Sequence, residues 1–170
     1  MIAEPSAAED SNSVSDRTSA ALLAAFLATN PGARTAGKSL RAGAEVAVTL
    51  GDTAGDWRVL ATAAGQLTFE QAKAADPDFE LHIPPRAVQS LCASSSADMG
   101  ALAVDFFELV VARDQQLKIH VKVNSGLIKL TRRGWLAVIA QGGPKVMMWL
   151  ARKGLHGPGA ITAALRKFSG

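Results

Sequence analysis

The segment QLKIHVKVN, residues 116–124, restricts the fold of this chain more than any other stretch. Its apolar residues Leu117, Ile119, Val121 and Val123 alternate with polar or charged ones, which is the period of a β-strand with one buried and one solvated face. Such a strand needs neighbouring strands that share its buried face and an apolar layer that covers it. The chain is therefore expected to fold around a sheet that has one solvent-exposed face.

Four other segments alternate in the same way and predict the remaining strands. They span residues 44–50, 57–63, 65–71 and 78–83. The turn sequence GDTAGD separates the first two, which favours a hairpin. We expect an α+β domain with about five strands in a largely antiparallel sheet and with helices packed on one side.

Helical spacing and helix-stop residues predict the helices. These are expected at residues 16–29, 84–93, 99–113, 126–141, 144–153 and 159–168. Asn30-Pro31-Gly32 stops the first, Asp98 can cap the third, and Asn124 or Ser125 can cap the fourth. An alternative for residues 126–141 is a hairpin that turns at Arg132-Arg133-Gly134, but the Gly-Gly-Pro sequence that follows favours a helix.

The two ends of the sequence differ in composition. Residues 1–15 are rich in Ala, Ser, Glu and Asp and have little to bury, which predicts a flexible acidic tail before a single domain at 16–170. The acidic start is unlike the basic start of an export signal. A single cysteine, Cys92, fits a reducing compartment, so we expect a cytoplasmic protein.

Charge is divided unevenly along the chain. Residues 1–114 hold 15 acidic and 8 basic residues, whereas residues 115–170 hold ten basic residues and no acidic one. Either the two halves neutralise each other on folding, or the second half forms a basic face for an anionic partner. The aromatic residues there lie among aliphatic ones, which disfavours nucleic acid and favours peripheral binding to an anionic membrane. The candidate docking residues are Lys129, Arg132, Arg133, Lys145, Arg152 and Lys153.

One formal nucleotide-binding pattern is present. GARTAGKS, residues 32–39, fits G-x-x-x-x-G-K-[ST], in which backbone amides and a lysine hold phosphates. That loop follows a buried strand and precedes a long helix, but here a predicted helix precedes it. We expect an ordinary loop without nucleotide, and an enzyme that uses this pattern is the weakest hypothesis.

Other signs of catalysis are missing from the sequence. His82, His120 and His156 lie on separate predicted elements without the spacing of metal ligands. Ser94, Ser95 and Ser96 lack the glycines of a nucleophile elbow. We expect no metal, no cofactor and no enzymatic activity.

The helices after residue 98 carry more apolar side chains than one sheet face can cover. One interpretation is an ordinary core with a homodimer contact. The other is a cavity for a hydrophobic ligand, with pliant Met and Trp side chains at its mouth. The candidate ligand-binding residues are Leu102, Phe106, Phe107, Val110, Leu127, Leu130, Trp135, Val138, Ile139, Met147, Met148 and Trp149.

Three strings resemble the sterol carrier protein type two family: DPDFELHIPPRAVQSLCA, QLKIHVKVNSGLIKL and RRGWLAVIAQGG. The resemblance covers residues 40–155, and Gln116 stands where many members have glycine. It implies a five-stranded sheet whose helices enclose an apolar tunnel for a sterol, fatty acyl or isoprenoid ligand, without catalysis. The leading hypothesis is a lipid-binding or lipid-transfer protein. The alternative is an accessory subunit, for example in lipid or isoprenoid biosynthesis, that docks a partner protein.

Overall fold

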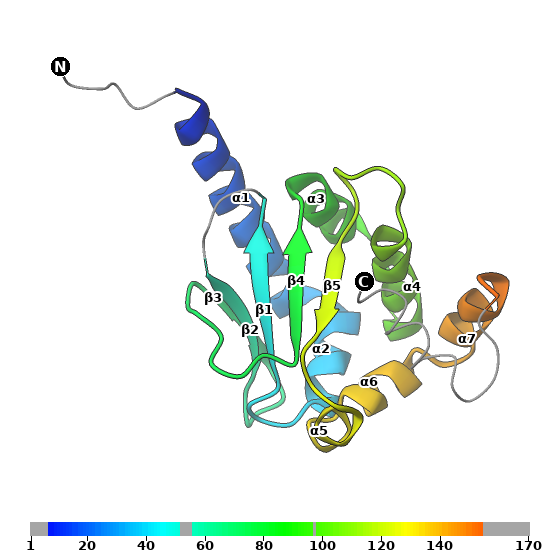
Figure 1. Cartoon of the computed structure of the whole chain (residues 1–170). Helices are drawn as coiled ribbons and strands as arrows, with labels where there is room; N and C mark the ends of the chain where they lie inside the picture. The colour runs from blue at the N-terminus through cyan, green and yellow to red at the C-terminus, as the bar shows by residue number, and fades with distance from the viewer. Residues whose placement is uncertain (1–6, 52–55, 97, 155–170) are drawn as a thin grey trace.

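A five-stranded sheet forms one layer of the molecule (Figure 1). The computed structural model describes residues 7–51, 56–96 and 98–154. The strands are β1 (Glu45–Leu50), β2 (Trp57–Ala61), β3 (Leu67–Glu70), β4 (Phe79–Ile83) and β5 (His120–Val123), in the order β3-β2-β1-β4-β5. All five predicted strands are confirmed, although β5 is shorter than its alternating pattern.

The pairing of the strands is antiparallel except at the centre of the sheet. β1 pairs antiparallel with β2, β2 with β3, and β4 with β5, whereas β1 and β4 run parallel, with Val46 opposite Phe79. The parallel pair requires a crossover connection, which the β2–β3 hairpin and the following residues 71–78 supply together. The prediction of a largely antiparallel sheet is confirmed.

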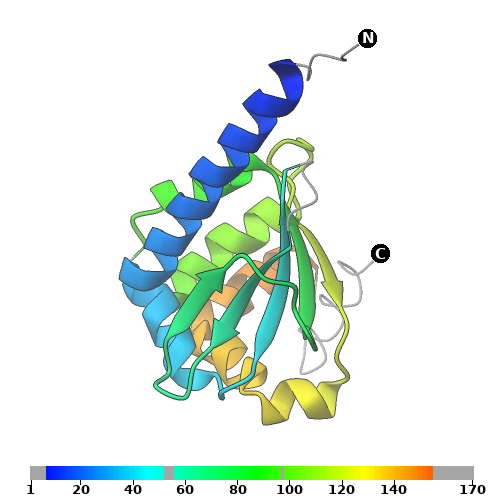
Figure 2. The ribbon, with the colours of Figure 1, turned by 90° about the vertical axis from the view of Figure 1, so that its left-hand side faces the viewer.

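Helices cover one face of this sheet (Figure 2). They are α1 (Ala7–Thr29), α2 (Pro31–Ser39), α3 (Pro85–Ala93), α4 (Met99–Val110), α5 (Leu127–Arg132), α6 (Trp135–Gln141) and α7 (Gly143–Arg152). The other face carries Thr49, Thr68, His120 and Lys122, which are exposed. The predicted α+β class, with helices on one side, is confirmed.

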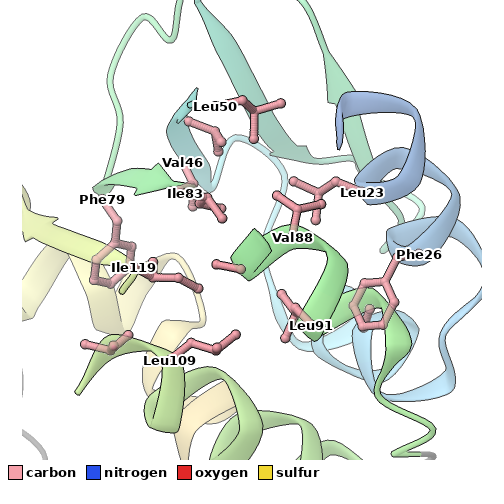
Figure 3. Packing of buried hydrophobic residues seen from close by; sticks show 14 of the residues in the cluster. Leu23, Phe26, Val46, Leu50, Phe79, Ile83, Val88, Leu91, Leu109 and Ile119 are labelled. Atoms are coloured by element: carbon pink, nitrogen blue, oxygen red, sulfur yellow. The ribbon is translucent and has the colours of Figure 1, made fainter. Parts of the chain in front are cut away.

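The main core lies between the sheet and helices α1, α3 and α4. Figure 3 shows Leu23 and Phe26 of α1 beside Val88 and Leu91 of α3, with strand residues such as Ile83 completing the cluster. Burying each such side chain contributes roughly 1.5–3 kcal/mol, so this cluster dominates the stability of the fold.

Two helical predictions at the start of the chain were wrong. The first helix begins at Ala7 rather than Asp16, because Ala and Glu at its start favour a helix and the acidic Glu9 and Asp10 suit its positive N-terminal dipole. The expected loop after Asn30 is helix α2. Asn30 ends α1 and also caps α2, since its side chain accepts from the Ala33 amide at 3.0 Å, and Pro31 occupies the first turn.

The segment 126–141 is helical, as predicted over the hairpin, but it is divided into α5 and α6. Gly134 has a φ of 89° and separates the two helices. The residue before α5 is Gly126, not Asn124 or Ser125, and no side chain caps this helix. The prediction of Asp98 as a cap is confirmed, since it accepts from the Ala101 amide at 2.9 Å. The helix predicted at 159–168 lies outside the described residues.

Replacing Gly134 with alanine is expected to destabilise the protein clearly more than replacing Gly143. Both glycines have positive φ, so either change should cost about 1–2 kcal/mol for the backbone conformation. A methyl group at Gly134 would also lie 2.1 Å from the Ser39 carbonyl oxygen, whereas one at Gly143 would meet nothing within 4 Å. Urea denaturation of the two variants measures the difference, and equal losses would contradict the close approach of α6 to Ser39.

Candidate functional site

A cavity of about 300 Å³ lies between the sheet and the helical layer. Every lining residue is apolar. The sheet contributes its covered face through residues such as Val48, Leu81 and Val121, and all helices except α5 contribute to the rest of the wall. The inward-facing side chains of the strands, which alternate with exposed ones, thus form both the core and the cavity wall.

Seven of the twelve candidate ligand residues line this cavity. They come from two helices: Leu102, Phe106, Phe107 and Val110 from α4, and Trp135, Val138 and Ile139 from α6. The structure therefore brings together residues that are up to 37 positions apart in the chain. Their contact with a ligand stays a prediction.

The other five candidates lie elsewhere. Leu130 belongs to the main core, and Trp149 stacks on Phe107 at a ring-centroid distance of 5.3 Å. Leu127, Met147 and Met148 are exposed. Part of the apolar excess of these helices is used where α7 packs on α4.

Several cavity residues were missing from the candidates. They lie on α1, α2 and the strands, and include Leu23, Phe26, Val46 and Phe79. Their period-two and helical spacing identified them as buried, but spacing does not tell a filled core from a wall with space behind it.

A buried carboxylate lies beside the cavity at the start of β4. The Asp78 side chain has 0% exposure, and it accepts hydrogen bonds from Trp135 Nε1 at 2.8 Å and Ser125 Oγ at 2.7 Å. The Arg133 guanidinium lies 3.0 Å from Asp78 Oδ1, the oxygen that also accepts from Ser125, and the Glu45 amide donates to Oδ2 at 3.3 Å. Since Trp135 lines the cavity, Asp78 fixes part of the cavity wall.

Two opposing effects set the acidity of this carboxyl group. Burial raises the pKa of Asp78, but the hydrogen bonds from Trp135, Ser125 and Arg133 favour the charged form and together hold it below its usual value. Asp78 is therefore an anion in the folded protein at neutral pH. Sequence inspection missed its role, because its partners lie about 50 positions further along the chain.

Four of the six candidate docking residues form ion pairs. Lys129 and Arg133 pair with Asp76 and Asp78, Lys145 pairs with Asp98 at 2.6 Å, and Lys153 lies 3.7 Å from Glu108. Arg132 and Arg152 are exposed and have no ion pair among the described residues. The two halves of the chain thus neutralise each other in part. Within the described ranges, no helix is both long and apolar enough to cross a bilayer.

The nucleotide-binding pattern has a structural role. Residues 32–39 lie in α2, so their backbone amides do not form a phosphate loop. A methyl group at Gly32 would lie 3.0 Å from Leu102 Cδ2, and one at Gly37 would lie 2.8 Å from the Gly65 carbonyl oxygen. The two glycines therefore allow α2 to pack closely against α4 and against the turn between β2 and β3.

Two histidines that the sequence placed on separate elements face each other. His82 and His120 are register partners on the exposed sheet face, with ring centroids 5.9 Å apart, and His82 Nε2 lies 2.7 Å from the Gly51 carbonyl oxygen. In the part of the chain that the structure describes, no three His, Cys, Asp or Glu side chains form a metal site. His156 lies outside that part.

No family model matches this chain, and no curated protein matches it. Among solved structures, it is similar to a UbiJ-SCP2 ubiquinone synthesis protein, with 15% sequence identity and a TM-score of 0.41. The alignment covers 83% of this chain and 99% of that one.

Proposed function

We propose that this chain is a non-catalytic lipid-binding protein whose cavity holds the apolar part of a lipid. The observation that carries the proposal is the wall itself, in which every residue is apolar. Transfer of hydrocarbon from water into such a space is favourable, whereas a polar group would lose its hydrogen bonds to water. The indole N–H of Trp135 already donates a hydrogen bond to Asp78, so it is not free to donate one to a polar group of the ligand. The lipid headgroup is therefore placed outside the cavity.

The size of the cavity favours a flexible chain as the ligand. A volume of about 300 Å³ is at the lower end of the range for small-molecule sites, which is roughly 300–1,000 Å³. A single fatty acyl or isoprenoid chain adapts to such a space more readily than the rigid fused rings of a sterol. The wall also lacks a carboxylate, imidazole or hydroxyl group that could act as acid, base or nucleophile, which supports binding without catalysis.

Docking on an anionic membrane is the second part of the proposal. A carrier that collects lipid must approach a bilayer, and exposed Arg132 and Arg152 lie in the half of the sequence that has no acidic residue. Basic residues near an anionic bilayer are attracted to its surface potential. Binding is therefore expected to weaken as the salt concentration rises.

The purified protein is expected to bind a fluorescent fatty acid in a saturable, one-to-one manner, because the residues that line the described cavity are all apolar. Fluorescence titration measures this, and displacement by an unlabelled fatty acid or a polyprenol tests the chemical class. Native mass spectrometry of protein from its own host would show a retained lipid as added mass. Absence of both probe binding and added mass would remove the proposal.

A second function is an accessory subunit that docks a partner protein. Exposed Leu127, Ile128, Met147 and Met148 favour it, since such side chains on a helix surface are typical of binding sites. A chain without affinity for apolar probes or vesicles that forms a stable complex, with itself or with another protein, would support this function in place of lipid binding.

A further inference from the structure

Helix α5 presents two adjacent large apolar residues to solvent. Ile128 is 79% exposed and Leu127 is 54% exposed. The helix lies at the end of the molecule opposite the start of α1, as both views show (Figure 1, Figure 2). Its remaining large apolar residue, Leu130, points into the core and anchors the helix to the domain. An element of this kind can enter another apolar phase without any loss of core packing.

Positive charge surrounds this apolar pair. Arg132 is exposed on the same helix, and no ion pair to it is present among the described residues. Lys129 and Arg133 are also on α5 or directly after it. Apolar side chains bordered by Lys and Arg, without acidic residues on the same helix, match the headgroup region of an anionic bilayer better than they match a protein surface.

Asp76 holds two of these cations. Its Oδ1 lies 2.5 Å from Lys129 Nζ, its Oδ2 lies 2.8 Å from an Arg133 terminal nitrogen, and its backbone carbonyl accepts from Arg133 at 2.9 Å. The Asp76 side chain is itself exposed, and ion pairs of this kind contribute little to stability. Lipid phosphates can therefore replace Asp76 at low cost. Both cations also pair with buried Asp78, Arg133 at 3.0 Å and Lys129 at 3.7 Å, so the longer contact makes Lys129 the partner that is more readily released.

We propose that α5 is the membrane-docking element, in which Leu127 and Ile128 enter the acyl boundary while Arg132 and Lys129 contact anionic headgroups, with Asp76 acting as a built-in competitor for those headgroups. This inference rests on the proposed function and names the part of the surface that performs the docking. Gly134 alone separates Arg133 from Trp135, so docking through α5 brings the α6 wall of the cavity close to the bilayer.

The test compares matched variants of the full chain in sedimentation with phosphatidylcholine vesicles, with or without phosphatidylglycerol. Leu127→Gln combined with Ile128→Gln should weaken binding to the anionic vesicles at least about tenfold, because two apolar side chains no longer leave water. The matched control is Met147→Gln with Met148→Gln, which removes the exposed pair of α7 and should leave binding nearly unchanged. Loss of binding in the α7 variant, and not in the α5 variant, would overturn the assignment.

A second comparison isolates Asp76. Asp76→Asn should strengthen binding to anionic vesicles about fivefold, since Lys129 becomes available to headgroups. Glu80→Gln makes the same change in net charge and releases Lys122 on the exposed sheet face, so its effect should be much smaller. Equal effects of the two variants would contradict the competitor role. Fluorescent fatty acid binding, measured without vesicles, tests the cavity separately, so failure of the docking inference can be distinguished from failure of lipid binding.

Discussion

Replacing Asp78 with alanine should lower the free energy of unfolding by about 3–5 kcal/mol, the loss typical of breaking a buried ion pair from one side. The change leaves the Arg133 guanidinium, the Trp135 indole and the Ser125 hydroxyl without their common acceptor. The Trp135 and Ser125 donors would have to find water or remain unpaired, whereas Arg133 would keep only its contacts with exposed Asp76. Urea denaturation at neutral pH measures the loss.

The matched control is Asp76→Ala, because Asp76 lies two residues earlier and pairs with the same cations but is exposed. It should destabilise the protein far less than Asp78→Ala. A similar loss in the two variants would mean that burial and the Trp135 and Ser125 hydrogen bonds do not matter.

The Asp78 contribution should also depend on pH. Its pKa in the folded protein lies below the value of about 3.9 that is usual for the unfolded chain. The unfolded state therefore takes up the proton first as the pH falls, so the contribution is complete above that value and disappears as the pH passes below the folded pKa. Asp76, Glu80 and Asp98 also have lowered pKa values, so the Asp78 part is the difference in pH dependence between wild type and Asp78→Ala.

Replacing Ile139 with tryptophan should weaken binding of the fluorescent fatty acid at least about tenfold, because the larger side chain occupies space that the ligand needs. Ile139 is well placed for this test. It lines the cavity and is half-buried, but it belongs to none of the packed clusters of the core. The variant should keep its fold, since the added ring enters a space instead of displacing neighbours.

Ile119→Ala is the complementary change. Ile119 is fully buried in the main core and does not line the cavity. This truncation should cost about 2–5 kcal/mol of stability while the probe affinity stays close to that of wild type. If Ile139→Trp instead destabilises the protein by about 1–3 kcal/mol, the cost of overpacking a full core, and leaves the probe affinity unchanged, the ligand binds elsewhere.

Sequence reasoning located the elements well where local chemistry decides them. The strands were found because their alternation matches burial on one face, and α4 was found because Asp98 caps it. It failed where a distant contact decides. The break at Gly134 depends on the close approach of the Ser39 backbone. The early start of α1 was missed for a local reason, because the many polar residues there obscured the Ala and Glu residues that favour a helix.

The candidate site was predicted in the same uneven way. Residues of α4 and α6 were identified because these helices are apolar over a broad arc. Leu127, Met147 and Met148 are exposed and do not line the cavity, because spacing alone does not show which side of a short peripheral helix faces inward; their contact with a ligand stays a prediction. Asp78 was predicted only as the first residue of the strand at 78–83, and only the folded chain brings Trp135 and Arg133 to it.

The parallel pairing of β1 with β4 has a consequence for how the protein forms during synthesis. Strands β1, β2 and β3 follow one another and pair with their neighbours, so they can assemble as soon as they leave the ribosome. Pairing of β4 with β1 places Phe79 opposite Val46, which is 33 positions earlier in the chain. The hydrogen bond from Trp135 to Asp78 spans 57 positions. Closing such long loops is slow, so the sheet side of the cavity should form well before α6 closes it. A nascent chain would then expose an apolar surface and an unpaired Asp78 carboxylate until the basic half of the sequence emerges.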